Sequence, residues 1–308
     1  MPKLAFVYHD GYDLQFGDHV FPSVKYRLIR ETLLDEGLVT PDSVHSPEPV
    51  SDEDLMLVHT EEWVKKLKQG TLSYAEILKL EIPYSRRIVN AFWLAAGGSI
   101  LAARLALKHG VAFNIGGGFH HAFPAHGEGF CAINDVAVAA RKLIHEQTLE
   151  RAMIVDCDVH HGNGTAAIFH DDKQVFTMSI HQFNNYPDIK PPSTLDLHLP
   201  DGIGDDEYLA RLHNALMPAI AEFRPQMLFY VAGADPYCED QLGGLNLTLD
   251  GLKRRDRLVI AAALDNKIPV AVTLAGGYAV KLEDTVRIHS NTAWVAEDLL
   301  RQSQWDAN

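Results

Sequence analysis

The sequence predicts an α/β fold with a largely parallel central sheet and helices on both faces. Strand-like and helix-like segments alternate along the chain, the pattern expected of parallel strands joined by crossover helices. The strand segments are continuously apolar, as strands buried on both faces are. No repeat, low-complexity tract or linker interrupts the 308 residues. One domain, residues 1–308, is therefore the simplest organisation.

Apolar runs bounded by polar or glycine-rich sequence predict the strands, and helical spacing of apolar residues predicts the helices. The expected strands span residues 3–9, 111–115, 153–158, 175–180, 227–232 and 269–274. The expected helices span residues 24–37, 61–68, 88–109, 132–145, 165–169, 205–223, 249–265 and 283–301. Gly37 is a stop signal, and Ser51 opens a capping-box pattern before an apolar run. Residues 70–83 are expected to form a loop or irregular helix, and the Pro- and Asn-rich residues 182–200 a loop.

Composition excludes some classes of protein and leaves others open. The formal net charge of -14 argues against sequence-independent binding to nucleic acid, which needs a basic surface. It is compatible with a basic substrate. Cys131, Cys157 and Cys238 are far apart and form no CxxC pair, which fits a reducing compartment. The first residues lack the features of a signal peptide, and no apolar stretch approaches membrane-spanning length, so we expect a cytoplasmic protein without membrane contact.

The segment DCDVHHGNG, residues 156–164, follows an apolar strand and predicts a metal site. Side chains alternate along a strand, so Asp156, Asp158 and His160 are expected on one side at its end. Two carboxylates and an imidazole on a buried face are costly unless they are paired. A divalent cation is the economical partner. The glycines that follow let the backbone approach whatever is bound.

Three other predicted strands also run directly into polar or glycine-rich sequence. Residues 111–115 lead to GGGFHH, residues 227–232 to GADPY, and residues 269–274 to AGGY. In open parallel α/β sheets, ligands bind at the carboxyl ends of the strands. These strand ends are therefore expected to meet the 156–164 segment at one edge of the sheet. Taken singly, each motif has a plain structural reading; together they indicate a site.

A hydrolytic zinc site usually has three protein ligands and one open position. Asp158 and His160 supply two ligands, and Asp235, just beyond a strand, is a suitable third. Two aspartates cancel the charge of the dication, so the site should acidify water less than an all-histidine site. A separate general base is then expected to matter.

The pair His120 and His121 is the candidate source of that base, with the other imidazole as acid or electrostatic partner. Asp156 and Asn163 are placed to orient the two rings by accepting from their second nitrogens. Tyr278, on a Gly-Gly turn, offers a hydroxyl that could stabilise an oxyanion.

The set GGGFHHA, GxGFCxIND, DxDxHHGNG, AGADPY and LAGGY resembles the zinc-dependent histone deacetylase family, which has the arginase/deacetylase-like fold. The resemblance covers nearly the whole chain, from about His9 to the last helix. Asn163 is like class II members, whereas class I has Asp there. The combination of motifs and the minimal length look most like class IV enzymes and their bacterial relatives.

The resemblance implies one Zn²⁺ held by Asp158, His160 and Asp235. It implies His120 and His121 as the paired histidines, the second acting as base, and Tyr278 as the residue that polarises the carbonyl. Asp156 would partner His120, and Asn163 would partner His121.

The family resemblance also implies an acyl-lysine tunnel and a monovalent cation. Gly129 would offer a backbone carbonyl to the tunnel, Phe130 one wall and Tyr186 the opposite wall. A structural K⁺ would lie beside the zinc strand, at Asp156, Asp158, His160, Ser179 and Ile180. Many members carry an Arg shortly after the proline of the first loop, lining an internal channel. Residues 21–24 hold none, so the sequence does not indicate a product-exit channel.

These observations predict a zinc-dependent deacylase that hydrolyses the amide of acetyl- or longer acyl-lysine side chains in a protein or peptide. One alternative is deacetylation of a small acylated amine such as an acetylpolyamine. A second is an arginase-type ureohydrolase, which would need ligands for two manganese ions. His120 and His121 stand where the extra carboxylate and histidine ligands would be needed. A third is a binding module that recognises acyl-lysine without cleaving it, although every candidate catalytic position is filled. The oligomeric state is left open.

Overall fold

The computed structural model of the chain describes residues 4–17, 19–303 and 305. Its centre is one eight-stranded sheet in the order β2-β1-β3-β8-β7-β4-β5-β6, and every strand pair is parallel. The strands are β1 (Ala5–Val7), β2 (Val44–His45), β3 (Val111–Asn114), β4 (Ala152–Asp156), β5 (Val175–Gln182), β6 (Leu195–Leu199), β7 (Met227–Val231) and β8 (Val270–Thr273). This confirms the α/β fold with a parallel sheet.

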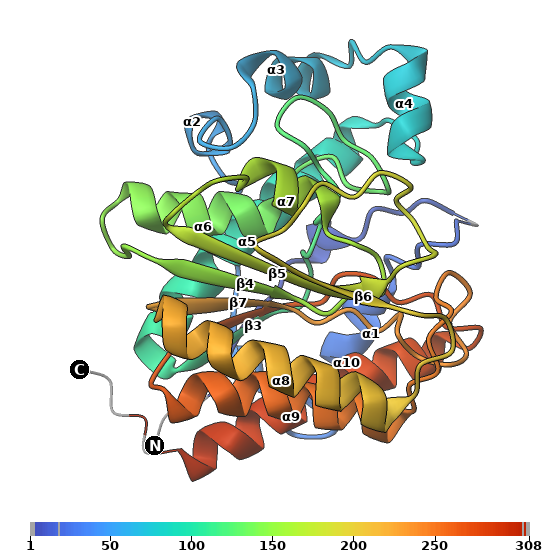
Figure 1. Ribbon diagram of the computed structural model, residues 1–308. Coiled ribbons are helices and arrows are strands. Elements are labelled where there is room, and N and C mark those ends of the chain that lie inside the picture. The colour runs from blue at the N-terminus through green and yellow to red at the C-terminus, as the bar shows by residue number, and fades with distance from the viewer. Residues whose placement is uncertain (1–3, 18, 304, 306–308) are drawn as a thin grey trace.

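Helices cover both faces of the sheet (Figure 1). On one side lie α5 (Arg86–His109), α6 (Asp135–His145) and α7 (Asn163–Ile168). On the other lie α1 (Lys25–Asp35), α8 (Asp205–Phe223), α9 (Leu249–Asp265) and α10 (Leu282–Gln302). Three short helices, α2 (Asp52–Leu55), α3 (Glu61–Gln69) and α4 (Tyr74–Leu80), lie beyond α6 and α7. Strands β3, β4, β7 and β8 are buried throughout, which explains their uninterrupted apolar sequence.

Helix α5 corrects the expectation that no apolar stretch approaches membrane-spanning length. By length and composition alone, its 24 residues are long and apolar enough to cross a membrane. However, 78% of its most apolar window is buried inside the protein, where α5 packs against α6 and the sheet. Its internal glycine Gly97 is explained by the loop between β2 and α2, because an added Cβ would lie 1.9 Å from the Glu48 carbonyl oxygen.

Two segments expected to be irregular are regular in the structure. Residues 74–80 form α4, which is started by a full capping box between Ser73 and Glu76. Within residues 182–200, Leu195–Leu199 form β6, which pairs with β5 along the edge of the sheet. The short β2 was also not expected. Lys3, the first residue of the predicted strand 3–9, lies outside the described residues, and β1 begins at Ala5.

The strand order brings the predicted polar strand ends together. The four strands that lead into the glycine-rich and polar motifs are consecutive neighbours in the sheet, in the order β3-β8-β7-β4. Since all strands are parallel, their carboxyl ends lie at one edge. Segments far apart in sequence, near residues 120, 160, 235 and 278, therefore meet there.

Candidate active site

The loop after β4 gathers Asp158 and His160 by a turn rather than by strand alternation. The strand ends at Asp156, two residues earlier than predicted. The carboxylate of Asp158 then accepts the backbone N–H of His160 at Oδ1, 2.9 Å away, and the His160 ring nitrogen Nδ1 lies 3.0 Å from the same oxygen. The expectation of one shared strand face beyond Asp156 is therefore wrong, although the side chains still meet.

Asp235, which follows β7, completes a cluster with these two residues. One donor atom from each of Asp158, His160 and Asp235 lies within 4.8 Å of the other two. The backbone N–H of Val159 donates to Asp235 Oδ1 at 2.8 Å. The other oxygen, Oδ2, lies 3.4 Å from His160 Nδ1 and has no hydrogen-bond partner among the described residues, although it is buried. We call these three residues the inner cluster.

Glycine backbone encloses the inner cluster. A Cβ added to Gly276 would lie 1.9 Å from Asp235 Oδ2 and 2.7 Å from Asp158 Oδ2. One added to Gly233 would meet Asp158 Oδ2 at 2.7 Å and Asp235 Oδ1 at 2.9 Å. The Gly276 N–H donates to Asp158 Oδ2 at 2.9 Å. No larger residue fits at these turns, which is why the sequence has glycine after β7 and β8.

The inner cluster has an excess of buried negative charge that requires a cation. Burial and the neighbouring Asp158 raise the pKa of Asp235 to about 7. Burial opposes a charge on His160, but Asp158 and Asp235 together raise its pKa to about 10. A proton on His160 would offset one of the two carboxylate charges, whereas a divalent metal would offset both. Two carboxylates, one imidazole and a buried unpaired oxygen fit the donor set of a zinc site.

The two histidines after β3 lie beside this cluster, each with the partner expected for it. His120 Nδ1 lies 2.6 Å from Asp156 Oδ2, and His121 Nδ1 lies 2.7 Å from Asn163 Oδ1. Burial disfavours the charged form of His120, but Asp156 and Asp158 outweigh it and raise its pKa to about 9. Burial and the charges of the neighbouring histidines lower the pKa of His121 well below its ordinary value. The two rings therefore differ in charge although they are adjacent.

Residues 134 and 135 hold the histidine loop in place. The Asn134 amide nitrogen Nδ2 donates to the carbonyl oxygens of His120 and Ala122, both at 3.4 Å. The buried Asp135 accepts the backbone N–H groups of Gly118 and Phe119. The motif GxGFCxIND was noted in the sequence, and Gly129 and Phe130 within it were assigned to the tunnel. No role was assigned to Asn134 or Asp135, because their partners lie about fifteen residues away in a loop.

Glu128 is a functional neighbour that the sequence did not reveal. Its buried carboxylate accepts from the Asn163 amide nitrogen and pairs with Lys79 Nζ at 2.7 Å and His126 Nε2 at 3.2 Å. Burial would raise its pKa, but these partners lower it to about 2. Since Asn163 Nδ2 faces Glu128, its oxygen must face His121. Nothing in the local sequence connects residue 128 with residue 163.

Lys25 supplies the buried cation that residues 21–24 lack. Its side chain is fully buried, and Nζ donates to the Ala275 carbonyl oxygen at 2.7 Å. Nζ also lies 5.8 Å from the centre of the Tyr278 ring and 5.0 Å from that of Phe21. Burial lowers its pKa to about 8, against the opposing effect of Asp235 and Asp158. Lys25 directly follows the segment 21–24 in which no arginine is present.

Tyr278 is fixed at the edge of the inner cluster by Asp240, another residue the sequence did not single out. The Tyr278 N–H donates to Asp240 Oδ2 at 2.7 Å, and Gln241 Nε2 donates to the Tyr278 carbonyl at 2.8 Å. The ring centres of Tyr278 and His160 are 6.4 Å apart. Burial and the charges of Asp235 and Asp158 raise the pKa of the phenol well above its usual value, so it stays protonated.

A narrow pocket leads from the surface to these groups. Its outer part, about 170 Å³, is lined by Glu81, His121, Gly129, Phe130, His160, Asn185, Tyr186, Leu242 and Tyr278. Gly129 forms the tightest point of the wall: an added Cβ would lie 2.7 Å from the His121 ring and 2.9 Å from the Tyr186 ring. An inner part of only about 20 Å³ continues past His120 and Asp158 toward Cys131. The three residues predicted to form the tunnel thus share one pocket.

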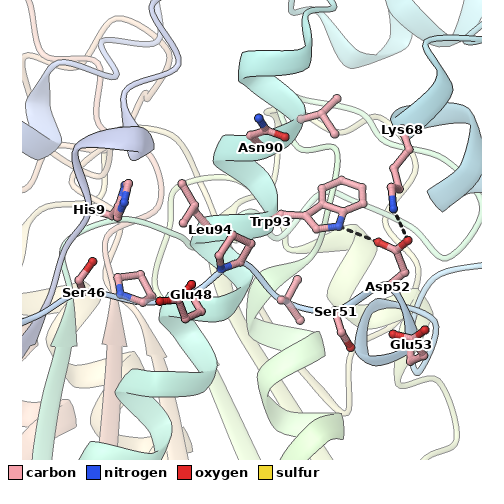
Figure 2. A pocket seen from close by; sticks show the side chains of 14 residues that line it. His9, Ser46, Glu48, Ser51, Asp52, Glu53, Lys68, Asn90, Trp93 and Leu94 are labelled. Atoms are coloured by element: carbon pink, nitrogen blue, oxygen red, sulfur yellow. Dashed lines mark hydrogen bonds and ion pairs between the residues drawn. The ribbon is translucent and has the colours of Figure 1, made fainter.

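A wider hollow lies elsewhere on the molecule and contains none of the predicted site residues (Figure 2). It measures about 720 Å³ and lies along the loop from Ser46 to Glu53 and one side of α5. Figure 2 shows Asp52 held there between Trp93 Nε1, at 3.0 Å, and Lys68. Its size does not make it the reactive site, because the buried titratable groups converge on the smaller pocket.

Of the residues expected to hold a monovalent cation, Asp158 and His160 lie in the loop after β4, whereas the other three lie on adjacent strands of the sheet. Asp156 on β4 is directly opposite Ser179 on β5, and Ile180 follows Ser179. The Ser179 hydroxyl lies 2.9 Å from His181 Nδ1. Asp156, which pairs with His120, and the two β5 residues therefore lie side by side.

Comparison with known proteins identifies the family. The family model described as the histone deacetylase domain matches residues 19–293. The chain belongs to the histone deacetylase family. It is 42% identical to an uncharacterized protein of the cyanobacterium Picosynechococcus over 95% of this chain and 98% of that one. It is 31% identical to histone deacetylase 2 of Arabidopsis thaliana, covering 98% of this chain and 80% of that one.

A solved structure supports the same assignment. The crystal structure of the HDA15 HD domain superposes with a TM-score of 0.81 and 26% identity, over 96% of this chain and 90% of that chain. This confirms the arginase/deacetylase-like fold and the family resemblance stated from the motifs. As a member of the family, the protein is a hydrolase with deacetylase activity.

Proposed function

We propose that the protein is a zinc-dependent deacylase acting on the side-chain amide of acylated lysine. The observation that carries the proposal is the inner cluster itself. It has three donor atoms within 4.8 Å of one another and a buried Asp235 oxygen to which none of the described residues donates a hydrogen bond. His120, His121 and Tyr278 line the same pocket. A single cluster at this point fits one metal better than the two-manganese set of a ureohydrolase.

Asp158, His160 and Asp235 would hold the zinc ion, which when bound supplies Lewis-acid activation of water and of the amide carbonyl. His121 is the base: it is held neutral by burial, and Asn163 fixes the Nδ1 side of its ring, so that Nε2 is free to accept a proton from the attacking water. His120, paired with Asp156, is its positively charged partner.

Tyr278 donates its hydroxyl proton as a hydrogen bond to the amide oxygen, where negative charge develops as water adds. Its phenol remains protonated because burial raises the pKa, so it can donate throughout the working pH range. Glu128 acts through Asn163: it fixes the amide so that the oxygen accepts from His121. Gly129, Phe130 and Tyr186 border the chain of the substrate.

We also propose that K⁺ binds beside Asp156, using carboxylate, hydroxyl and carbonyl oxygens, which suit a hard monovalent cation. Ser179 and Ile180 on β5 would supply ligands opposite Asp156. A cation there would hold the Asp156 carboxylate in place and so fix the orientation of His120.

The dimensions of the pocket favour an acetyl group over a long acyl chain. The inner part, about 20 Å³, has room for a water-sized group, whereas each further methylene needs additional space. A small acetylated amine remains the second candidate, because Glu81 lines the outer pocket and would attract a second cationic amine. The protein or peptide substrate is proposed first, since the aromatic walls suit the alkyl stem of lysine.

The test combines a Tyr278→Phe variant with a panel of substrates. Zinc-loaded enzyme is assayed on acetyl-lysine peptide, longer acyl-lysine peptide and acetylspermidine. We expect the acetyl peptide to be the best substrate, and Tyr278→Phe to lower kcat by roughly 100-fold, the cost of one oxyanion donor. Bound zinc should stay unchanged. Full turnover by Tyr278→Phe contradicts the role of the tyrosine, and faster turnover of acetylspermidine replaces the substrate class.

A further inference from the structure

A second group of metal-binding side chains lies on the strands next to the inner cluster. One donor atom from each of His161, His181 and Asp196 lies within 4.8 Å of the other two. His161 follows the inner-cluster residue His160 in the chain, while His181 lies on β5 and Asp196 on β6. We call these three residues the outer cluster. None of them takes part in the reaction proposed above.

The distances and the residue types fit a tetrahedral metal ion. His161 Nε2 lies 3.1 Å from Asp196 Oδ1. In a tetrahedral zinc site with ordinary bond lengths the ligand atoms are about 3.3 Å apart, so this pair is already at coordinating separation. Two imidazoles and one carboxylate favour zinc and similar transition ions over calcium or magnesium.

A further imidazole lies beside His181, outside the set of three donor atoms that meet within 4.8 Å. The exposed His198, on β6, has its Nδ1 2.8 Å from His181 Nε2. Two imidazole nitrogens at this distance either share one proton or face a common cation. His198 also lines an open hollow with Phe183, Asn184 and Lys190, which gives an ion a route in from solvent. A metal site needs such a route.

The surrounding groups orient the donors as they do in metal sites. The Ser179 hydroxyl lies 2.9 Å from His181 Nδ1, so the other nitrogen of that ring points to the cluster. The Ser193 N–H donates to Asp196 Oδ2 at 2.9 Å, which leaves Oδ1 for the ion.

We propose that His161, His181 and Asp196 bind a second divalent transition-metal ion, with His198 as the fourth ligand. The ion cross-links β5, β6 and the loop after β4. It fixes both ends of the connection from Phe183 to Thr194, which carries Tyr186 to the outer pocket. The site therefore stabilises the rim of the substrate pocket without taking part in the reaction.

The experiment counts metal in the full-length protein. The chain is stripped with a chelator and titrated with Co²⁺, followed by visible absorption, and bound zinc is measured separately by elemental analysis. We expect two equivalents per chain. Asp196→Asn, which keeps the shape of the side chain, should weaken one of them by at least about 100-fold, beyond the effect of losing an orienting partner. Asp188→Asn, an exposed carboxylate on the same connection, is the matched control and should retain both.

Every outcome decides the proposal. One equivalent in the unaltered chain, or two equivalents that survive Asp196→Asn, would overturn it and leave the outer cluster as a hydrogen-bonded group. Asp235→Asn separates this result from the proposed function, because it should remove the inner equivalent only. Suppose that the unaltered chain binds one equivalent and that Asp235→Asn does not remove it. The assignment of zinc to the inner cluster is then wrong instead. The cobalt titration of the unaltered chain requires no variant to fold.

Discussion

The inner and outer clusters each combine carboxylate and imidazole, but backbone N–H groups hold both carboxylates of the inner cluster, whereas the outer cluster relies mainly on side chains and on one backbone N–H, that of Ser193. In the inner cluster, the N–H groups of Val159, His160 and Gly276 donate to the carboxylates, and glycines leave no space around them. In the outer cluster, hydroxyl and imidazole groups orient the donors, and one member of the network is exposed. Backbone is hard to displace, so the first arrangement suits chemistry that needs fixed geometry. The second suits a cross-link that tolerates adjustment.

The largest effect is expected from filling the glycine wall of the inner cluster. Gly276→Ala puts a methyl group 1.9 Å from Asp235 Oδ2, so the carboxylate must move out of line with Asp158. We expect loss of the inner metal equivalent and a fall in kcat/KM of at least about 1,000-fold, as for other losses of a catalytic assembly. Metal analysis and peptide turnover measure this.

Gly204→Ala is the matched control for that variant. Its backbone has no left-handed strain, and the nearest atom to an added Cβ is 3.8 Å away. It should keep both metal and turnover. If Gly276→Ala retains full zinc content and turnover, the glycine wall does not determine the geometry of the inner cluster.

A smaller effect is expected where a side chain supports the inner site. Glu128→Gln keeps an oxygen near Asn163 but removes the charge, so the amide is less firmly oriented toward His121. We expect kcat to fall by about 10-fold, as for the loss of a partner that orients a functional side chain, with KM little changed. A pH–rate profile with a shifted acid limb would separate this from a purely structural defect.

Stability gives an independent measurement of the same carboxylate. Glu128 has a folded-state pKa of about 2, below its ordinary value of 4.5. A depressed carboxyl pKa stabilises the fold above the ordinary value, and that contribution is lost as pH falls from about 4.5 toward 2. Thermal unfolding should therefore show Glu128→Gln less stable than the unaltered chain at pH 7, with a smaller difference at pH 3. An unchanged gap at both values would contradict the assignment.

The smallest effect is expected at the exposed edge of the outer cluster. His198→Gln removes the solvent-facing donor, which water can replace, so the second cobalt equivalent should weaken by about 10-fold, less than for Asp196→Asn. The titration used for the outer cluster measures both variants together. If His198→Gln weakened the second cobalt equivalent as much as Asp196→Asn, the burial of a ligand would not determine its contribution to metal affinity at this site.

The sequence predicted the parts of the molecule in which pattern and chemistry agree. Helices 205–223 and 249–265 have the predicted limits, because their apolar spacing and end signals are unambiguous. The rule for parallel sheets was enough to predict that the four polar strand ends meet at one edge. By contrast, β6 was hidden in a Pro- and Asn-rich segment, where Leu195–Leu199 alternates between leucine and polar residues and forms an edge strand of mixed burial.

Residues that act across the fold were the ones missed. Glu128 touches Asn163, and Lys25 reaches Ala275, 250 residues away in the chain, so no local pattern reveals either contact. The outer cluster was missed for the same reason, since His161 and Asp196 meet only once β4, β5 and β6 are aligned. The motifs showed which residues carry chemistry, whereas the supporting contacts depend on strand order.

The strand order also fixes when the inner cluster can exist during synthesis. The Gly276 N–H donates to Asp158, which lies 118 residues earlier in the chain. The Val159 N–H donates to Asp235, which lies 76 residues later. The strand that precedes Gly276, β8, is the last in the chain, yet it inserts between β3 and β7. Until it has left the ribosome, the nascent chain has a gap at the centre of its sheet and only part of its metal pocket. The inner metal pocket is thus complete only when the segment after β8 packs against the segments after β4 and β7.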